Sequence, residues 1–210
     1  MTEKVLYRSN WAKRGRKSTF AEAKSPRFLT KSEYERLLGA CAHNPRDFAL
    51  IQLLLQTGIK LSELTRLTVN NVELPSRTLP EAKETGYLHI KGSERQKART
   101  LPLNHKACLA LDQYLSQRLL QTNSVLFINQ IGKPLGPRGV GKIIGKYLEQ
   151  VGISDANVQS LRHTFSAHHA SKGASMKTIQ EAMGCKDVRS TNIYITLTRE
   201  MSQEMQNNAR

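Results

Sequence analysis

Residues 159–194 combine side chains that could act on a charged substrate. The segment opens with Arg162 and His163 on an expected helix and ends on Tyr194, 32 residues after the arginine. Arginine binds anionic oxygens, imidazole exchanges protons, and a tyrosine hydroxyl can serve as a nucleophile. Taken singly, Tyr194 would be read as a half-buried aromatic and Arg162 as a surface helix cation, so their joint placement carries the argument.

Two helices are expected to position these side chains. The first begins near Gln159 and stops at Gly173, a residue type that commonly ends helices. The second is amphipathic and breaks at Gly184 and Cys185. Its apolar face comprises Met176, Ile179 and Met183.

The composition points to a polyanionic partner. Thirty-two Lys and Arg face 17 Asp and Glu, which gives a formal charge of +15. Nucleic acid is the first candidate and an anionic membrane surface the second. The longest apolar run, residues 50–55, is too short to span a bilayer, and no signal-peptide core is visible. Three scattered cysteines fit neither a disulfide framework nor a zinc site, so we expect a cytoplasmic protein.

Two helices are expected before residue 60. Thr30 and Glu33 have capping-box spacing, ahead of a helix that ends near His43. Asn44 and Pro45 begin the next helix, and a glycine at position 58 ends it. This second helix is nearly all apolar, so it is expected to be buried at the centre of the domain.

The remaining elements predict a mainly α fold with a small antiparallel β-sheet or hairpin. Residues 86–91 and 98–103 read as two strands joined by a turn. Residues 125–128 read as a short buried strand, and a basic helix begins at Pro137. A helix from Asn104 is expected to bury an apolar face made of Leu109, Leu111, Tyr114, Leu115 and Leu119.

These motifs resemble the catalytic domain of the tyrosine recombinase, or phage integrase, family over roughly residues 26–197. The family pattern H-x-L-R-H-T-F, an apolar helix ending L-G-H, and T-T-x-x-Y is similar to residues 159–194. T-G-x-R-x-S-E-L is similar to residues 57–64, and G-K-G-x-K-x-R-x-x-P-L to residues 91–103 with two extra turn residues. The matching positions in the first pattern are Leu161, Arg162, His163, Thr164, Phe165, Gly173, Ile179, Gln180, Gly184, Thr191 and Tyr194.

The resemblance implies a DNA breaking-rejoining fold and transesterification of a DNA phosphodiester, without a metal or other cofactor. Tyr194 would be the nucleophile, Arg162 a phosphate clamp, and Lys97 the general acid, its position counted back from the hairpin's Arg99. The catalytic residues implied are Tyr194, Arg162, Lys97, Lys60, Gln159, Cys185 and His163.

Three positions depart from the family pattern. Lys60 replaces an arginine and cannot form a planar bidentate fork, so it would be a reduced clamp. Gln159 replaces a histidine; it can donate a hydrogen bond but cannot relay a proton. Cys185 replaces a histidine or tryptophan and is a weak donor. Two hypotheses follow: an attenuated recombinase, or a catalytically inactive DNA-binding protein. Topoisomerase-like relaxation is a third, remoter one.

Double-stranded DNA is the expected partner. A basic arm at residues 1–25 and a basic stripe on the expected helix from Pro137 are its candidate contacts, and solvated charge is the alternative reading of both. The DNA-contacting residues predicted are Lys13, Arg14, Arg16, Lys17, Arg95, Arg99, Arg138, Lys142 and Lys146.

We expect three parts: the arm at 1–25, a catalytic domain at 26–197 and a tail at 198–210. Family members carry a separate N-terminal domain that 25 arm residues are too few to replace, so the chain is a natural short form, relies on its arm, or is a fragment. Family members also exchange C-terminal tails on DNA. We therefore expect a monomer in solution that forms a tetramer on DNA through its tail.

Overall fold

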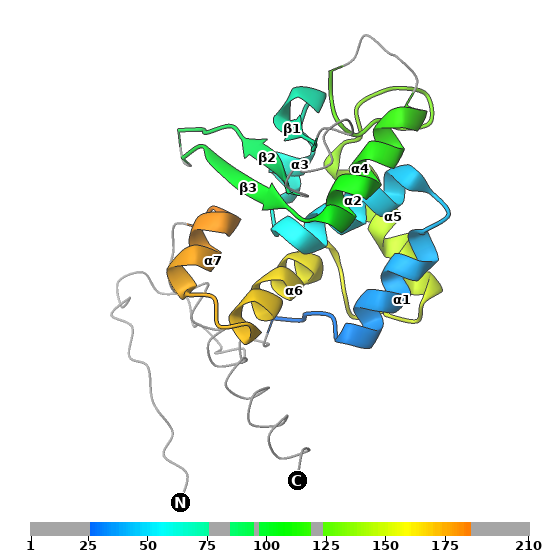
Figure 1. Ribbon diagram of the computed structural model, residues 1–210. Coiled ribbons are helices and arrows are strands. Elements are labelled where there is room, and N and C mark those ends of the chain that lie inside the picture. Colours follow the sequence, from blue (N-terminus) through cyan, green and yellow to red (C-terminus); the bar gives the residue numbers. More distant parts are fainter. Residues whose placement is uncertain (1–25, 76–84, 95–96, 119–123, 186–210) are drawn as a thin grey trace, which may run out of the picture.

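The computed structural model describes residues 26–75, 85–94, 97–118 and 124–185 (Figure 1). Several predicted functional positions therefore lie outside the described residues. These are the nucleophile Tyr194, the hairpin residue Arg95, the C-terminal tail, and the arm with Lys13, Arg14, Arg16 and Lys17.

The first two helices begin and end where their capping residues predict. The Thr30 hydroxyl accepts the Glu33 amide at 3.2 Å and the Glu33 carboxylate accepts the Thr30 amide at 2.8 Å, which starts α1 (Lys31–Cys41). The Asn44 side chain accepts the Asp47 amide at 3.1 Å and starts α2 (Pro45–Thr57). Gly58 ends α2 in the left-handed region, with φ 58°. Both predicted helices are confirmed.

Helix α2 is the centre of the fold, as its apolar sequence predicts. Leu50, Ile51, Leu53 and Leu54 are each at most 1 % exposed. α2 packs against α1, against α4 (His105–Gln117) and against α6 (Val158–Ser171) (Figure 1). Because these neighbours surround α2, the position of its C-terminal end is fixed from several sides.

A three-stranded antiparallel sheet lies beside the helices in the order β1-β2-β3. β2 (Gly86–Ile90) and β3 (Arg99–Leu103) form the predicted hairpin, with Ile90 opposite Arg99. β1 (Val72–Glu73) is an additional strand that the sequence did not predict. The short helix α3 (Leu61–Leu64) and the 3₁₀ turn Val69–Asn71 connect α2 to this sheet.

Two local predictions were wrong. Residues 125–128 are mostly buried but form no strand of the sheet; they make isolated bridges, Thr68 with Val125 and Ile128 with Pro134, because their neighbours are connecting segments. Leu109 is 53 % exposed, since residues 107, 108, 111 and 114 take the buried face of α4 and position 109 lies opposite. Leu119 lies outside the described residues.

The C-terminal helices follow the predicted order. α5 (Pro137–Gln150) packs on α1, α3 and α6. α7 (Met176–Met183) packs on α6 and β3, where Ile179 and Met183 form a small second core with Phe165. Among the described helices, none is long and apolar enough to cross a membrane.

Candidate active site

Arg162 is the centre of the candidate site. It lies in α6 and is only 6 % exposed. Its guanidinium donates to the carbonyl oxygen of Gly58, to the carbonyl oxygen of Met183 at 2.8 Å and to the thiol of Cys185 at 3.1 Å. Arg162 therefore lies where the C-terminal ends of α2 and α7 meet.

These contacts hold the guanidinium without neutralising it. Carbonyl oxygens and a thiol are uncharged, and they satisfy hydrogen-bond donors that would be costly to bury unpaired. An arginine has five N–H donors, and these contacts use three of them. A positive charge fixed in this way can bind the oxygens of a phosphate.

A pocket of about 280 Å³ opens beside Arg162. Gln159, exposed in the first turn of α6, lines it together with Arg162. The Asn157 side chain caps this helix by accepting the amides of residues 159 and 160 at 2.8 and 3.3 Å. Ile59 and Leu61 also line the pocket, and they flank Lys60 in the sequence. Thus Arg162, Gln159 and the segment carrying Lys60 are brought together.

Glu63 is a further residue of the site, and none of the predicted roles included it. Its carboxylate accepts the Lys60 amide at 2.8 Å and pairs with Arg99 through two hydrogen bonds of 2.8 Å. Burial alone would raise the pKa of Glu63, but the hydrogen bonds from Arg99 and Lys60 and the charges of Arg99 and Arg162 lower it. The signal was present, since Glu63 follows Lys60 by the three residues at which a carboxylate reaches back to a helix start.

Arg99 is occupied inside the protein. Besides pairing with Glu63, it donates through Nε to the carbonyl oxygen of Ala182 at 2.8 Å. The Arg99 and Glu63 side chains are 11 % and 10 % exposed. These contacts differ from the DNA contact expected for Arg99, because its guanidinium joins β3, α3 and α7.

The C-terminal end of α7 positions Cys185. Gly184 adopts φ 63°, and the Cys185 amide donates to the carbonyl oxygen of Gln180 at 3.1 Å. This is the bond pattern of a glycine-terminated helix. It leaves the half-buried thiol against Arg162.

His163 is half-buried beside Arg162 on α6. Burial, and after it the charge of Arg162, lowers the pKa of His163. The imidazole is therefore mainly neutral near pH 7, which suits a supporting role better than a charged one.

The remaining described candidates lie on exposed surface. Lys97 is exposed and lies two residues before β3, in the hairpin where it was predicted. It is not among the residues that contact Arg162 through the hydrogen bonds described above. Arg138, Lys142 and Lys146 are exposed along α5, as the predicted basic stripe requires. The Lys146 ammonium lies 5.2 Å from the ring centroid of Tyr147.

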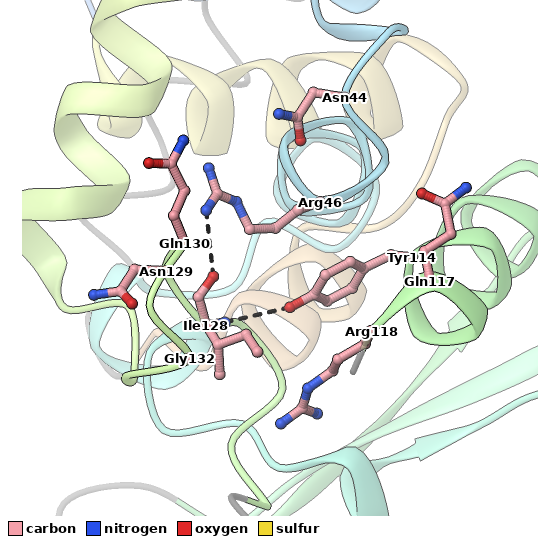
Figure 2. A pocket seen from close by; sticks show the side chains of 9 residues that line it. All are labelled: Asn44, Arg46, Tyr114, Gln117, Arg118, Ile128, Asn129, Gln130 and Gly132. Carbon is pink, nitrogen blue, oxygen red and sulfur yellow. Dashed lines mark hydrogen bonds between the residues drawn. The ribbon is translucent and has the colours of Figure 1, made fainter. Parts of the chain in front are cut away.

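A second pocket lies at the other end of α2. Figure 2 shows Arg46 from α2 and Tyr114 from α4 beside the loop at residues 128–132. Arg46 pairs with Asp47 at 2.7 Å and donates to the carbonyl oxygen of Ile128 at 3.3 Å. None of the predicted catalytic residues lines this pocket, so we do not assign it to the reaction.

Sequence comparison finds tyrosine recombinases, the family that the motifs resemble. The chain is 34 % identical over 189 residues to tyrosine recombinase XerC of Roseiflexus castenholzii, covering 84 % of this chain and 57 % of that protein. It is 32 % identical over 192 residues to XerC of Bacillus subtilis, covering 86 % of this chain and 60 % of that protein. The chain therefore spans less than two thirds of the length of these curated relatives.

Solved structures share the fold. The crystal structure of XerA recombinase matches with a TM-score of 0.75 at 25 % identity, over 88 % of this chain and 65 % of that one. XerH recombinase bound to its difH substrate in a post-cleavage complex matches with a TM-score of 0.73 at 23 % identity, over 90 % of this chain and 55 % of that one. Residues 27–201, which include every described helix and strand, match the profile of the phage integrase family. The chain therefore belongs to the phage integrase family.

Proposed function

We propose that this chain is the catalytic domain of a site-specific tyrosine recombinase that cleaves and rejoins double-stranded DNA. The observation that carries the proposal is Arg162, a buried guanidinium held by neutral groups beside Gln159 and the Lys60 segment. A fixed cation of this kind stabilises the charge that develops on a reacting phosphate.

The proposed reaction needs no external energy source. The Tyr194 oxygen bonds to phosphorus as the bond from phosphorus to the 5′-oxygen breaks. The tyrosine loses its proton to solvent water, and Lys97 supplies a proton to the departing 5′-oxygen. The products are a 3′-phosphotyrosyl link and a free 5′-hydroxyl, and the reverse step rejoins the strand.

We propose that the activity is attenuated. Lys60 offers a point charge in place of a bidentate fork, and Gln159 offers an amide that cannot relay a proton. The Cys185 sulfur accepts a hydrogen bond from Arg162 at 3.1 Å, and its thiol is a weaker donor than the histidine or tryptophan of the family pattern. Losing one donor from such a clamp costs about 10²–10³ in rate, and these losses are not additive because the clamp acts as a unit.

Other parts of the chain are proposed to bind DNA and neighbouring protomers. The exposed cations of α5 would contact phosphates together with the arm at residues 1–25, around a catalytic domain at 26–197. The tail at 198–210 would join neighbouring protomers in a tetramer assembled on DNA.

A nicked suicide substrate tests the proposal, because the fragment with the free 5′-hydroxyl diffuses away after cleavage and the covalent intermediate is trapped. A labelled pool of nicked duplexes with randomised core sequence should yield a protein–DNA adduct that survives denaturation. Tyr194→Phe should bind the same DNA without forming an adduct, and Arg162→Ala should form it about 10²–10³ more slowly. An adduct that persists in Tyr194→Phe would exclude this nucleophile.

The alternative is a catalytically inactive DNA-binding protein, favoured by Gln159, whose exposed amide lines the pocket where the family pattern has histidine. The variant carrying Lys60→Arg, Gln159→His and Cys185→His separates the two. If the native chain binds DNA without an adduct and this variant forms one, the alternative holds. If both form the adduct and the variant is faster, the native enzyme is attenuated. Relaxation of a supercoiled plasmid would reveal topoisomerase-like activity.

A further inference from the structure

We infer that Arg99 is a positioning residue that fixes the C-terminal end of α7, from which the chain continues towards Tyr194. Its structural part stands on the contacts of Arg99 alone. Its catalytic consequence rests on the proposed function, because it assigns Arg99 an effect on the nucleophile and not on DNA affinity.

Two arginines hold neighbouring carbonyl groups at this helix end. Arg99 donates to the carbonyl oxygen of Ala182 at 2.8 Å, and Arg162 donates to that of Met183 at 2.8 Å. The last four carbonyl groups of a helix have no partner within the helix, and its C-terminus carries a partial negative charge. Two guanidinium groups therefore satisfy and stabilise the end of α7 at adjacent residues.

Helix α7 needs such support. It has only 8 residues, and isolated helices shorter than about 12–15 residues are marginal in water. Its buried apolar side chains are Ile179 and Met183, so it contributes little to the core. The orientation of its last turn must then depend strongly on polar contacts made by neighbouring elements.

Glu63 explains why Arg99 is rigid enough for this role. Both of its carboxylate oxygens accept from Arg99 at 2.8 Å, which fixes the plane of the guanidinium and leaves Nε directed at α7. The same carboxylate accepts the Lys60 amide at 2.8 Å. The ion pair between Glu63 and Arg99 thus links the start of α3, the start of β3 and the end of α7 through hydrogen bonds.

A hydrogen-exchange experiment tests the structural part without requiring activity. Arg99→Gln removes the ion pair and the Ala182 contact together. The matched control is Arg46→Gln, which removes another partly buried ion pair, with Asp47. Arg46 lies at the opposite end of α2, in the pocket of Figure 2, which none of the predicted catalytic residues lines.

In Arg99→Gln, amides of residues 176–185 should exchange about tenfold faster than in the native chain, while those of α1 and α2 keep their rates. Arg46→Gln should leave residues 176–185 unchanged. Native exchange rates for residues 176–185 in Arg99→Gln, or an equal acceleration in both variants, would overturn the inference.

A second measurement distinguishes an effect of Arg99 through α7 from an effect through Lys97, the hairpin lysine two residues before it. In a substrate whose bridging 5′-oxygen is replaced by sulfur, the leaving thiolate needs no proton, so loss of Lys97 is bypassed. At saturating DNA, Arg99→Gln should cleave about 10²-fold more slowly with either leaving atom, with unchanged DNA affinity. Lys97→Ala should be slow with oxygen only.

Two results would count against the inference, and a third would count against the proposed function alone. Rescue of Arg99→Gln by sulfur would mean that Arg99 acts through Lys97. Weaker DNA binding with a normal rate at saturation would make Arg99 a DNA contact. If the native chain forms no adduct with either substrate, the proposed function fails, and the exchange rates of residues 176–185 still decide whether Arg99 holds α7.

Discussion

Two titratable residues of the candidate site, His163 and Glu63, respond differently to burial. Burial and then the charge of Arg162 lower the pKa of His163, so its imidazole stays neutral over a wider pH range. Burial alone would raise the pKa of Glu63, yet its cationic partners lower it overall. At neutral pH the site therefore contains two fixed guanidinium groups, an ionised carboxylate and a mainly neutral imidazole.

Mild acid should destabilise the fold through the histidines of α6. Burial is the largest cause that lowers the pKa of His163, His168 and His169. An unfolded histidine protonates near pH 6.5, so below that value the unfolded chain binds more protons than the folded one. The free energy of unfolding should thus fall as the pH drops from 6.5 through the lowered folded pKa values.

Urea unfolding at about pH 7.5 and about pH 5.5 measures this loss. His163→Gln should lose less free energy of unfolding between the two pH values than the native chain. An identical loss in the variant would show that the titration of His163 is not linked to folding.

At the scale of elements, Gly58 joins the end of α2 to α6. Its carbonyl oxygen accepts from Arg162, and its α-carbon faces the ring of Phe165. A β-carbon at this position would lie 2.4 Å from Phe165 Cδ1, closer than atoms can approach. The absence of a side chain at Gly58 therefore lets α2 and α6 approach closely enough to share Arg162.

Gly58→Ala should lower the free energy of unfolding by at least about 2 kcal/mol, combining the left-handed backbone with a steric clash. Gly173→Ala is the matched control, because Gly173 also has a positive φ, 81°, but nothing lies within 4 Å of its added β-carbon. Chemical denaturation of both variants measures the difference. Equal losses would mean that the contact with Phe165 relaxes without cost.

The sequence predicted the helices well because their signals are local. Capping residues and glycines at 30, 44, 58 and 184 start or end elements where expected. The contacts that assemble the site are not local: Arg99 and Glu63 are 36 residues apart, and Arg162 and Gly58 are 104 apart. Neither charge nor periodicity reveals that Arg99 faces the partly buried carboxylate of Glu63 and not solvent. Strand β1 was missed because two residues carry too little alternation to be recognised.

At the scale of the whole molecule, the exposed cations of α5 are candidate DNA contacts that do not line the pocket beside Arg162. Arg138, Lys142 and Lys146 are all exposed on a helix that packs against α1, α3 and α6. α5 thereby contacts both α3 and α6, the helices that position the Lys60 segment and Arg162.

Neutralising these three cations to Gln should weaken DNA binding and flatten its salt dependence. Each lost phosphate contact should reduce the slope of log affinity against log salt by about 0.9. The control variant neutralises Lys31, Lys106 and Lys133, three exposed lysines on other segments. Fluorescence anisotropy across a salt series measures both slopes, and equal changes in the two variants would mean that only net charge matters.

The neutral contacts of Arg162 also bear on the entropy of binding. Its side chain is anchored at Gly58, Met183 and Cys185 in the free protein, so the rotamer freedom of the arginine, roughly 2 kcal/mol, is lost when the chain folds and not when a phosphate arrives. A phosphate entering the pocket meets a guanidinium already oriented, as in other preorganised sites. Folding, and not ligand binding, therefore fixes the orientation of this guanidinium.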